Sequence, residues 1–311
     1  IIKFFYLFIK ILSFLYITLP KIFKVINFNK SNRFYRSIYI RESLNLIKKI
    51  FNSLNYNIPV TISKDKIILN IDGVLINLND ISRYLKKKDQ KYHNGAKYLE
   101  DLFDFSNAKI FLDFGACIGE YSIYFAKNYP QSKIFSFEAN PANLKHFKEN
   151  IKINNVEKNI KIFENAISDS DNKNYSIINK KQSSEVIISN NKVSNRTLTL
   201  SSIISNEKLD KIDFIKIDIE SSNYKVSKCI IDNASKIDGI QYEFSKGPQD
   251  KFINLVEKVN NIYEYYIIDE NEFKIINLSD LKEKIKKNVF TSRNGFDVFF
   301  KKKYNQKINL E

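Results

Sequence analysis

The sequence contains no methionine, no tryptophan, two cysteines and two histidines in 311 residues. Cys117 and Cys229 lie far apart in the chain and cannot form a disulfide framework, so we expect a reducing, cytoplasmic compartment. Because His93 and His146 stand outside any Cys/His cluster, a structural zinc site is not expected. An initiator methionine is missing too, which we interpret as a processed or truncated N-terminus.

Long uncharged runs are absent from the first 41 residues. The longest, Ile11–Pro20, has ten residues and is too short to span a bilayer core of about 30 Å. Residues 1–41 carry eight Lys/Arg and no Asp/Glu among many large apolar side chains. This pattern is typical of a helix lying in the membrane interface, where it would contact the inner face peripherally. A helix packed against the rest of the protein is the alternative, and the lack of a small-residue cleavage site disfavours a signal peptide.

From residue 108 onwards, apolar runs of four to six residues alternate with helical patterns. This alternation predicts an α/β fold with a mainly parallel sheet and helices on both faces, where ligands bind beyond the carboxyl ends of the strands. Residues 42–107 form an accessory segment, with a short helix at 42–55 and strands between Ile58 and Leu78. The expected α/β domain therefore comprises residues 108–311. Its expected strands are Lys109–Phe114, Lys133–Phe137, Ile160–Glu164, Phe214–Ile219, Ile240–Phe244, Tyr265–Ile268, Phe273–Ile276 and Phe296–Phe300, and its expected helices are Glu120–Asn128, Pro141–Asn154 and Gln249–Asn260.

The loop "FLDFGACIGEY" (Phe111–Tyr121) lacks the features of a phosphate-binding loop. A dinucleotide fingerprint starting at Gly115 needs glycines where Cys117 and Glu120 stand, and the Lys-Ser/Thr ending of a P-loop is missing. The acid Glu120 would also repel a pyrophosphate. Glu138, however, ends the next strand 19 residues after Gly119, where a carboxylate binds a ribose diol. The loop therefore favours a nucleoside without phosphates.

S-adenosylmethionine meets these requirements. It has a ribose, no phosphate, and cationic sulfonium and ammonium groups, which the negative charges of Asp113 and Glu120 suit. The small residues Gly115, Ala116 and Gly119 would let backbone approach its methionine part.

Four ordered motifs then resemble those of the FkbM family of methyltransferases. They are "DFGACIGEY", "EANP" (Glu138–Pro141) with the following "NIKINN" (Asn150–Asn155), "AISD" (Ala166–Asp169) and "KIDIES" (Lys216–Ser221), with "TLTLSSII" (Thr197–Ile204) before the last. The resemblance covers about residues 108–244 and, more loosely, the closing strands. It implies a Rossmann-like class I methyltransferase fold with a seven-stranded, mostly parallel sheet, preceded by a helical and β-hairpin extension.

The resemblance also implies O-methylation of a hydroxyl on a sugar, glycan or secondary metabolite. Asp218, at the end of its strand, is the candidate base or a ligand of a divalent cation such as Mg²⁺, and Glu220 and Glu243 could complete an acidic cluster. Alternatively, Glu220 caps a helix and Glu243 pairs with a lysine. The candidate cofactor-binding residues are Asp113, Gly115, Ala116, Gly119, Glu120, Tyr121, Glu138, Asn140, Asn165 and Ala166.

Two other functions stay open. Cys117, Ala139, Ser221 and Asn223 depart from the family pattern, and the last two lie beside the expected acceptor cleft, so a fold that binds cofactor without turnover is one alternative. A net charge of +15, with 19 Lys/Arg against 8 Asp/Glu in residues 1–110, suggests a nucleic-acid methyltransferase or binder. The Asn/Asp-Pro-Pro-aromatic motif and a Pro-Cys nucleophile are missing, so nucleic acid is not the expected partner.

Overall fold

A computed structural model describes residues 60–62, 67–71, 73–78, 96–179, 184–188, 196–244, 248–269, 272–291 and 296–303. The chain divides into two units, residues 1–68 and 69–311. The segment 1–41, expected to lie in the membrane interface, the helix expected at 42–55 and His93 lie outside the described residues. Strand β1 (Val60–Ile62) belongs to the first unit, β2 (Ile67–Ile71) crosses the boundary, and β3 (Val74–Leu78) belongs to the second.

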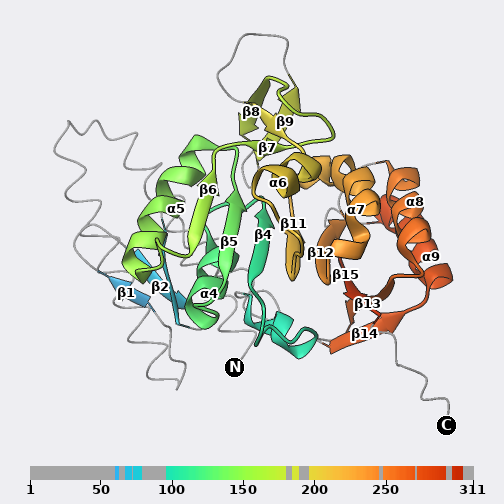
Figure 1. Ribbon diagram of the computed structural model, residues 1–311, viewed down its shortest axis with the longest axis horizontal. Helices are drawn as coiled ribbons and strands as arrows, with labels where there is room; N and C mark the ends of the chain where they lie inside the picture. The colour runs from blue at the N-terminus through green and yellow to red at the C-terminus, as the bar shows by residue number, and fades with distance from the viewer. Residues whose placement is uncertain are drawn as a thin grey trace, which may run out of the picture. The chain divides into compact units, whose positions relative to one another are not determined.

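A mostly parallel eight-stranded sheet forms the centre of the second unit, in the order β14-β13-β15-β12-β11-β4-β5-β6 (Figure 1). The parallel neighbours are β4 (Ile110–Phe114), β5 (Lys133–Phe137), β6 (Ile160–Phe163), β11 (Phe214–Ile217) and β12 (Gly239–Phe244). Antiparallel pairing joins β15 (Phe296–Lys302), β13 (Tyr263–Asp269) and β14 (Glu272–Ile276). The expected α/β class is confirmed, but the expected count of seven strands is wrong, because β14 folds back on β13 as an added edge strand.

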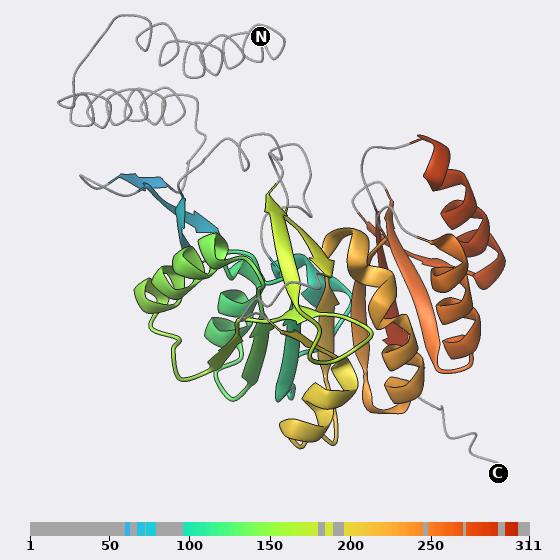
Figure 2. The same ribbon diagram turned by 90° about the horizontal axis from the view of Figure 1, so that it is seen from above.

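Helices cover both faces of this sheet. On one face lie α6 (Leu200–Asn206), α7 (Ser227–Asn233), α8 (Gln249–Val259) and α9 (Leu278–Thr291), the last three grouped together in Figure 2. Their apolar side chains join those of alternate strand residues such as Leu112, Ile215 and Tyr242 in one core. The opposite face carries α4 (Glu120–Asn128) and the short 3₁₀ helix η1 (Lys97–Asp101), with α5 (Pro141–Asn154) beside α4.

Aromatic rings fill the space between α4 and the sheet. Phe125 of α4 stacks on Phe111 of β4 with ring centroids 4.2 Å apart, and Phe105 contacts both at 5.3 and 5.4 Å. Burying each ring contributes about 2 kcal/mol. These rings cover the part of this face near the amino ends of the parallel strands. Polar residues two positions further along the same strands therefore come together near the carboxyl ends.

Two elements outside the large sheet follow β6. Strand β7 (Ala166–Ile167) pairs in parallel with β10 (Thr197–Leu198), which joins the two motifs "AISD" and "TLTLSSII". Between them, β8 (Tyr175–Asn179) and β9 (Ser184–Ile188) form an antiparallel hairpin, which is drawn at the top of Figure 1. The strand β9 also packs next to η2 (Glu220–Val226), the 3₁₀ helix that follows β11.

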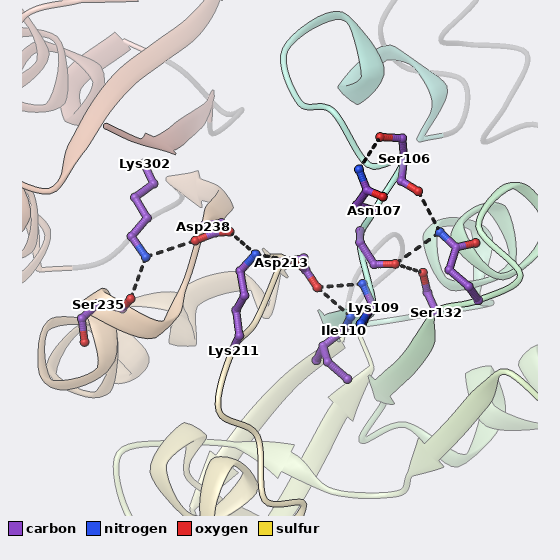
Figure 3. Close-up of polar contacts among 12 residues, drawn as sticks. Ser106, Asn107, Lys109, Ile110, Ser132, Lys211, Asp213, Ser235, Asp238 and Lys302 are labelled. Carbon is purple, nitrogen blue, oxygen red and sulfur yellow. Dashed lines mark hydrogen bonds and ion pairs between the residues drawn. The ribbon is translucent and has the colours of Figure 1, made fainter. Parts of the chain in front are cut away.

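Ion pairs lie at the opposite end of the sheet, where the parallel strands begin and the antiparallel strand β15 ends (Figure 3). The Lys211 ammonium lies 3.0 Å from Asp213 Oδ1 and 2.6 Å from Asp238 Oδ2, and Lys302 pairs with Asp238 Oδ1 at 3.1 Å. Asp213 Oδ2 also accepts the backbone N–H groups of Lys109 and Ile110, at 2.7 and 2.9 Å. This cluster joins β4, β11, β12 and β15 at one end of the sheet. It thereby helps to fix the relative positions of these strands at the opposite end.

Candidate active site

Four acidic side chains lie at or just beyond the carboxyl ends of neighbouring parallel strands. They are Asp113 on β4, Glu138 after β5, Asp218 after β11 and Glu243 on β12. The strand register sets Lys216 opposite Asp113 on one side and opposite Gln241 on the other. Paired residues point to the same face of a sheet, so Asp113, Lys216 and Gln241 form a polar row.

The glycines of the loop after β4 are required by contacts within the protein. Gly115 has a φ of +81°, and a Cβ there would lie 1.9 Å from the carbonyl oxygen of Asp218. Gly119, the N-cap of α4, has a φ of +88°, and a Cβ there would lie 2.1 Å from the ring of Phe147. The backbone N–H groups of Gly115 and Ala116 both donate to Phe137 O at 3.0 Å. The glycine pattern thus has a structural reason that is independent of any ligand.

Asp113 is 2% exposed and faces the protein interior. Its Oδ2 accepts a hydrogen bond from Ser122 Oγ at 2.6 Å, and Ser122 Oγ lies 2.7 Å from Ser136 Oγ. Its Oδ1 lies 3.6 Å from the Lys216 ammonium. Asp113 therefore fixes the start of α4 against β4 and β5. Glu120 and Tyr121 are the first two residues of that helix.

Glu138 holds the loop and the next helix together. Its Oε2 accepts the N–H of Cys117 at 2.7 Å, and its Oε1 accepts the N–H of Asn140 at 2.7 Å and the amide of Asn143 at 3.3 Å. Burial raises the pKa of Glu138, and these N–H donors oppose the rise. Cys117 has a φ of 51°, in the left-handed region that Asn and Gly adopt more readily than Cys.

The remaining residues expected at the cofactor have contacts of their own. Asn140 caps α5 by accepting the N–H of Ala142 at 3.0 Å, and Asn165 donates to Arg196 O at 2.8 Å. Ala166 is buried in β7. Sequence reasoning missed Tyr175, which is fully buried, interacts with the backbone of Ala166 and lies near Glu138. Its pKa is raised to about 12, first by burial.

Lys216 is the buried cation of the site, and sequence reasoning missed it. It is 6% exposed, and its ammonium lies 3.4 Å from Asp218 Oδ2, donates to Gly115 O at 3.2 Å and stands 5.1 Å from the centre of the Tyr121 ring. Burial works against its charge, but Asp218 and Asp113 raise the pKa of Lys216 above its usual range. Lys216 stands within a short apolar strand, and nothing in that stretch of sequence indicates that its side chain points inward.

Asp218 is the most accessible acid of this group, with 42% of its side chain exposed. It interacts with Glu243, whose pKa rises to about 9 because of burial first and then the charge and hydrogen bond of Asp218. A neutral Glu243 can donate a proton to the Asp218 carboxylate. Glu220 starts η2 with a φ of 57° and adds charge near Glu243.

A chain of buried polar groups lies beneath these acids. The amide of Gln241 donates to Tyr98 OH at 2.9 Å and to Asp297 Oδ2 at 3.1 Å, and Tyr98 OH lies 2.9 Å from Tyr121 OH. Asp297 stands directly opposite Glu243 in the β12–β15 register. Residues up to 199 positions apart in sequence thus meet at one edge, which only the topology could reveal.

Asn223, a departure from the family pattern, has a structural role. Its Oδ1 accepts the N–H of Ile219 at 2.7 Å, and its amide donates to Glu243 O at 2.6 Å. It bridges the ends of β11 and β12 and is 4% exposed. An ionised Asp could not make the second bond, so the amide of Asn223 has a structural reason at this position.

No group of three or more His, Cys, Asp or Glu side chains in the described part of the chain could hold a metal ion. The cation between Asp113 and Asp218 is the Lys216 ammonium. Likewise, no helix among the residues that the structure covers is both long and apolar enough to cross a bilayer.

Comparison with known proteins gives a family and a set of remote structural neighbours. A search of curated sequences finds no significant match. Among solved structures, the chain is similar to a putative transferase from Pyrococcus horikoshii (14% identity, 79% of this chain and 72% of that one, TM-score 0.37). It is also similar to a precorrin-6y C5,15-methyltransferase from Geobacter metallireducens (13% identity, 67% of this chain and 86% of that one, TM-score 0.36). A third similar structure is M. jannaschii TYW2 in complex with AdoMet (16% identity, 79% of this chain and 86% of that one, TM-score 0.37).

The model of the methyltransferase FkbM domain matches residues 113–281, more than half of the chain. This chain belongs to the FkbM methyltransferase domain family. The match begins at Asp113 and includes Asp218 and Glu243, whereas Tyr98 and Asp297 lie outside it.

Proposed function

We propose that this chain transfers a methyl group from S-adenosylmethionine to a hydroxyl oxygen of a sugar, glycan or secondary metabolite. The observation that carries the proposal is the placing of one accessible carboxylate, Asp218, against a buried ammonium and a partly buried acid. Lys216 lies 3.4 Å from its Oδ2, and Glu243 interacts with it. An open acid fixed in this way at the carboxyl edge of a parallel sheet suits a general base.

The cofactor would lie along the loop after β4. Glu138 and the backbone of residues 115–119 would hold its ribose and methionine part, and Tyr175, beside Glu138 and Ala166, would border its base. A buried carboxylate held rigid by N–H donors suits the two hydroxyls of a ribose. When bound, S-adenosylmethionine supplies an electrophilic methyl group on a good leaving group.

The residues of the chain then supply alignment and proton transfer. Asp218 accepts the proton of the acceptor hydroxyl as the oxygen becomes a nucleophile. Lys216 stabilises the Asp218 carboxylate before the transfer, and neutral Glu243 donates a hydrogen bond to it. Asp113 and Ser122 keep the loop in place and do not exchange protons with the acceptor.

The acceptor would carry an apolar part. Ile178 and Ile187 on the β8–β9 hairpin are 47% and 42% exposed, and β9 lies next to η2, which follows Asp218. Exposed branched side chains beside the reactive edge support a lipid-linked glycan or similar acceptor, rather than a free sugar or a nucleic acid. A peripheral contact of residues 1–41 with the inner face of the membrane would bring the enzyme to such an acceptor.

Calorimetric titration of the full chain with S-adenosylmethionine, S-adenosylhomocysteine and NAD tests the cofactor. We expect micromolar binding of the first two, none of NAD, and loss of binding in Glu138→Ala. Glu164→Ala is the matched control, because that exposed glutamate follows the adjacent strand. No binding of either adenosyl compound by the wild type would overturn the proposal.

Transfer of a labelled methyl group into extracted lipid-linked glycans tests the reaction. Asp218→Asn should lower the rate by about 100- to 10,000-fold, because the hydroxyl loses its base. Its affinity for S-adenosylhomocysteine should stay within about twofold of wild type. Undiminished transfer by Asp218→Asn would refute the role of this residue.

A further inference from the structure

Two buried asparagines of the "NIKINN" stretch bind strand β3 through its backbone. Asn154 Oδ1 accepts the N–H of Leu75 at 2.9 Å, and Asn154 Nδ2 donates to Leu75 O at 2.7 Å. Asn150 Oδ1 accepts the N–H of Asn77 at 2.8 Å. The two side chains, one helical turn apart on α5, thus pair with β3 much as a neighbouring strand would.

Asn150 makes a second bond that Asn154 does not make. Its Nδ2 donates to Ile118 O at 2.9 Å, in the loop between β4 and α4. Ile118 directly follows Cys117, whose N–H donates to Glu138 at 2.7 Å. A single side chain, 0% exposed, therefore touches both β3 and the backbone that Glu138 holds.

We infer that Asn150 is a positioning residue for the cofactor loop and that it couples the shape of this loop to the docking of β3. The expected effect on cofactor affinity rests on the proposed function, because it requires that the chain bind S-adenosylmethionine. The bond to Ile118 O fixes the Ile118–Gly119 peptide, which closes the short loop whose other end donates the Cys117 N–H to Glu138, and so it restrains the loop that Glu138 holds. The bond to Asn77 fixes Asn150 itself, so displacement of β3 releases the loop.

A linkage of this kind acts in both directions. If docked β3 raises cofactor affinity, bound cofactor must hold β3 more firmly by the same factor. Lys127 of α4 adds to the docking, since its ammonium donates to Gly73 O at 2.5 Å.

The matched pair Asn150→Ala and Asn154→Ala tests the inference in the full chain. Both remove bonds to β3, and only the first removes the bond to the loop. We expect similar losses of melting temperature, but about tenfold weaker S-adenosylhomocysteine binding in Asn150→Ala alone. Asn150→Asp, which keeps an acceptor for the Asn77 N–H and loses the donor, should weaken binding as well if the alanine variant fails to fold.

Amide hydrogen exchange of residues 115–119 without ligand is the second readout. We expect faster exchange in Asn150→Ala than in Asn154→Ala, since only the former frees the loop. Equal exchange and equal affinity in the two variants would overturn the inference. If the wild type binds no S-adenosylhomocysteine, the proposed function fails, while the exchange comparison still decides whether Asn150 positions the loop.

Discussion

Replacing Glu243 by glutamine should stabilise the protein, and by more as the pH rises. Glu243 is partly buried beside Asp218 and near Asp297 and Glu220, which raises its pKa to about 9. Glutamine has nearly the same shape, can donate to Asp218 as a neutral glutamic acid does, and carries no proton that must be taken up on folding. The variant should therefore resemble the protonated wild type at every pH.

The size of the effect follows from proton linkage. An unfolded glutamate titrates near pH 4.3, so between about pH 4.3 and 9 the folded state binds a proton that the unfolded state has released. Stability then falls by up to about 1.4 kcal/mol per pH unit in this window. The penalty is absent below the window and reaches its limit above it. At pH 7 it amounts to at most about 3 to 4 kcal/mol, a large share of a typical folding free energy.

Urea unfolding of the wild type and Glu243→Gln from pH 4.5 to 8.5 measures this difference. We expect nearly equal free energies of unfolding at pH 4.5 and a gap of a few kcal/mol in favour of the variant at pH 8. Glu157→Gln, at an exposed site after α5, should show no such pH-dependent gap. A gap between wild type and Glu243→Gln that stays constant with pH would refute the reasoning.

Two further predictions concern the ends of the strands. Asp213→Asn should cost about 1 to 3 kcal/mol at pH 6, because charge-assisted bonds at the base of β4 and β11 are lost. The pKa of Asp213 is lowered by the N–H groups of Lys109 and Ile110 and by Lys211 despite burial, so its contribution exists above about pH 4 and is lost as the pH falls further; chemical unfolding at pH 6 and 3 checks that the gap closes. Gly119→Ala should lower the melting temperature by 10 °C or more, since a methyl group meets Phe147 at a positive φ, and an unchanged thermal scan would count against this packing.

The helices with clear end signals could be predicted to the residue. Pro141 follows an Asn that accepts the Ala142 N–H, and Asn155 ends the helix in the left-handed conformation, so α5 spans Pro141–Asn154 as expected. Helix α4 also matches Glu120–Asn128, because Gly119 marks its start. The strand cores were visible as short apolar runs between helical patterns, whereas the pairing of β14 with β13 needed the three-dimensional arrangement.

The inner part of the site could not be predicted, because its members look ordinary in sequence. Lysine is seldom buried, and only the strand register shows that Lys216 lies between Asp113 and Gln241. Tyr98 and Gln241 lie 143 positions apart, and their hydrogen bond depends on the fold of the whole unit. The acids at the strand ends, by contrast, could be predicted, since parallel strands bring their carboxyl ends to one edge.

The position of β15 constrains the order in which the protein can assemble. This strand, residues 296–302, lies between β12 and β13, although both precede it in the chain. During synthesis, the edges of β12 and β13 that pair with β15 stay unpaired until β15 has been made. Unpaired edges of this kind can form non-native β-pairings. Insertion of β15 closes the gap and at the same moment brings Asp297 opposite Glu243. Completion of the sheet and completion of the acidic edge are thus one event, and a nascent chain short of β15 has neither.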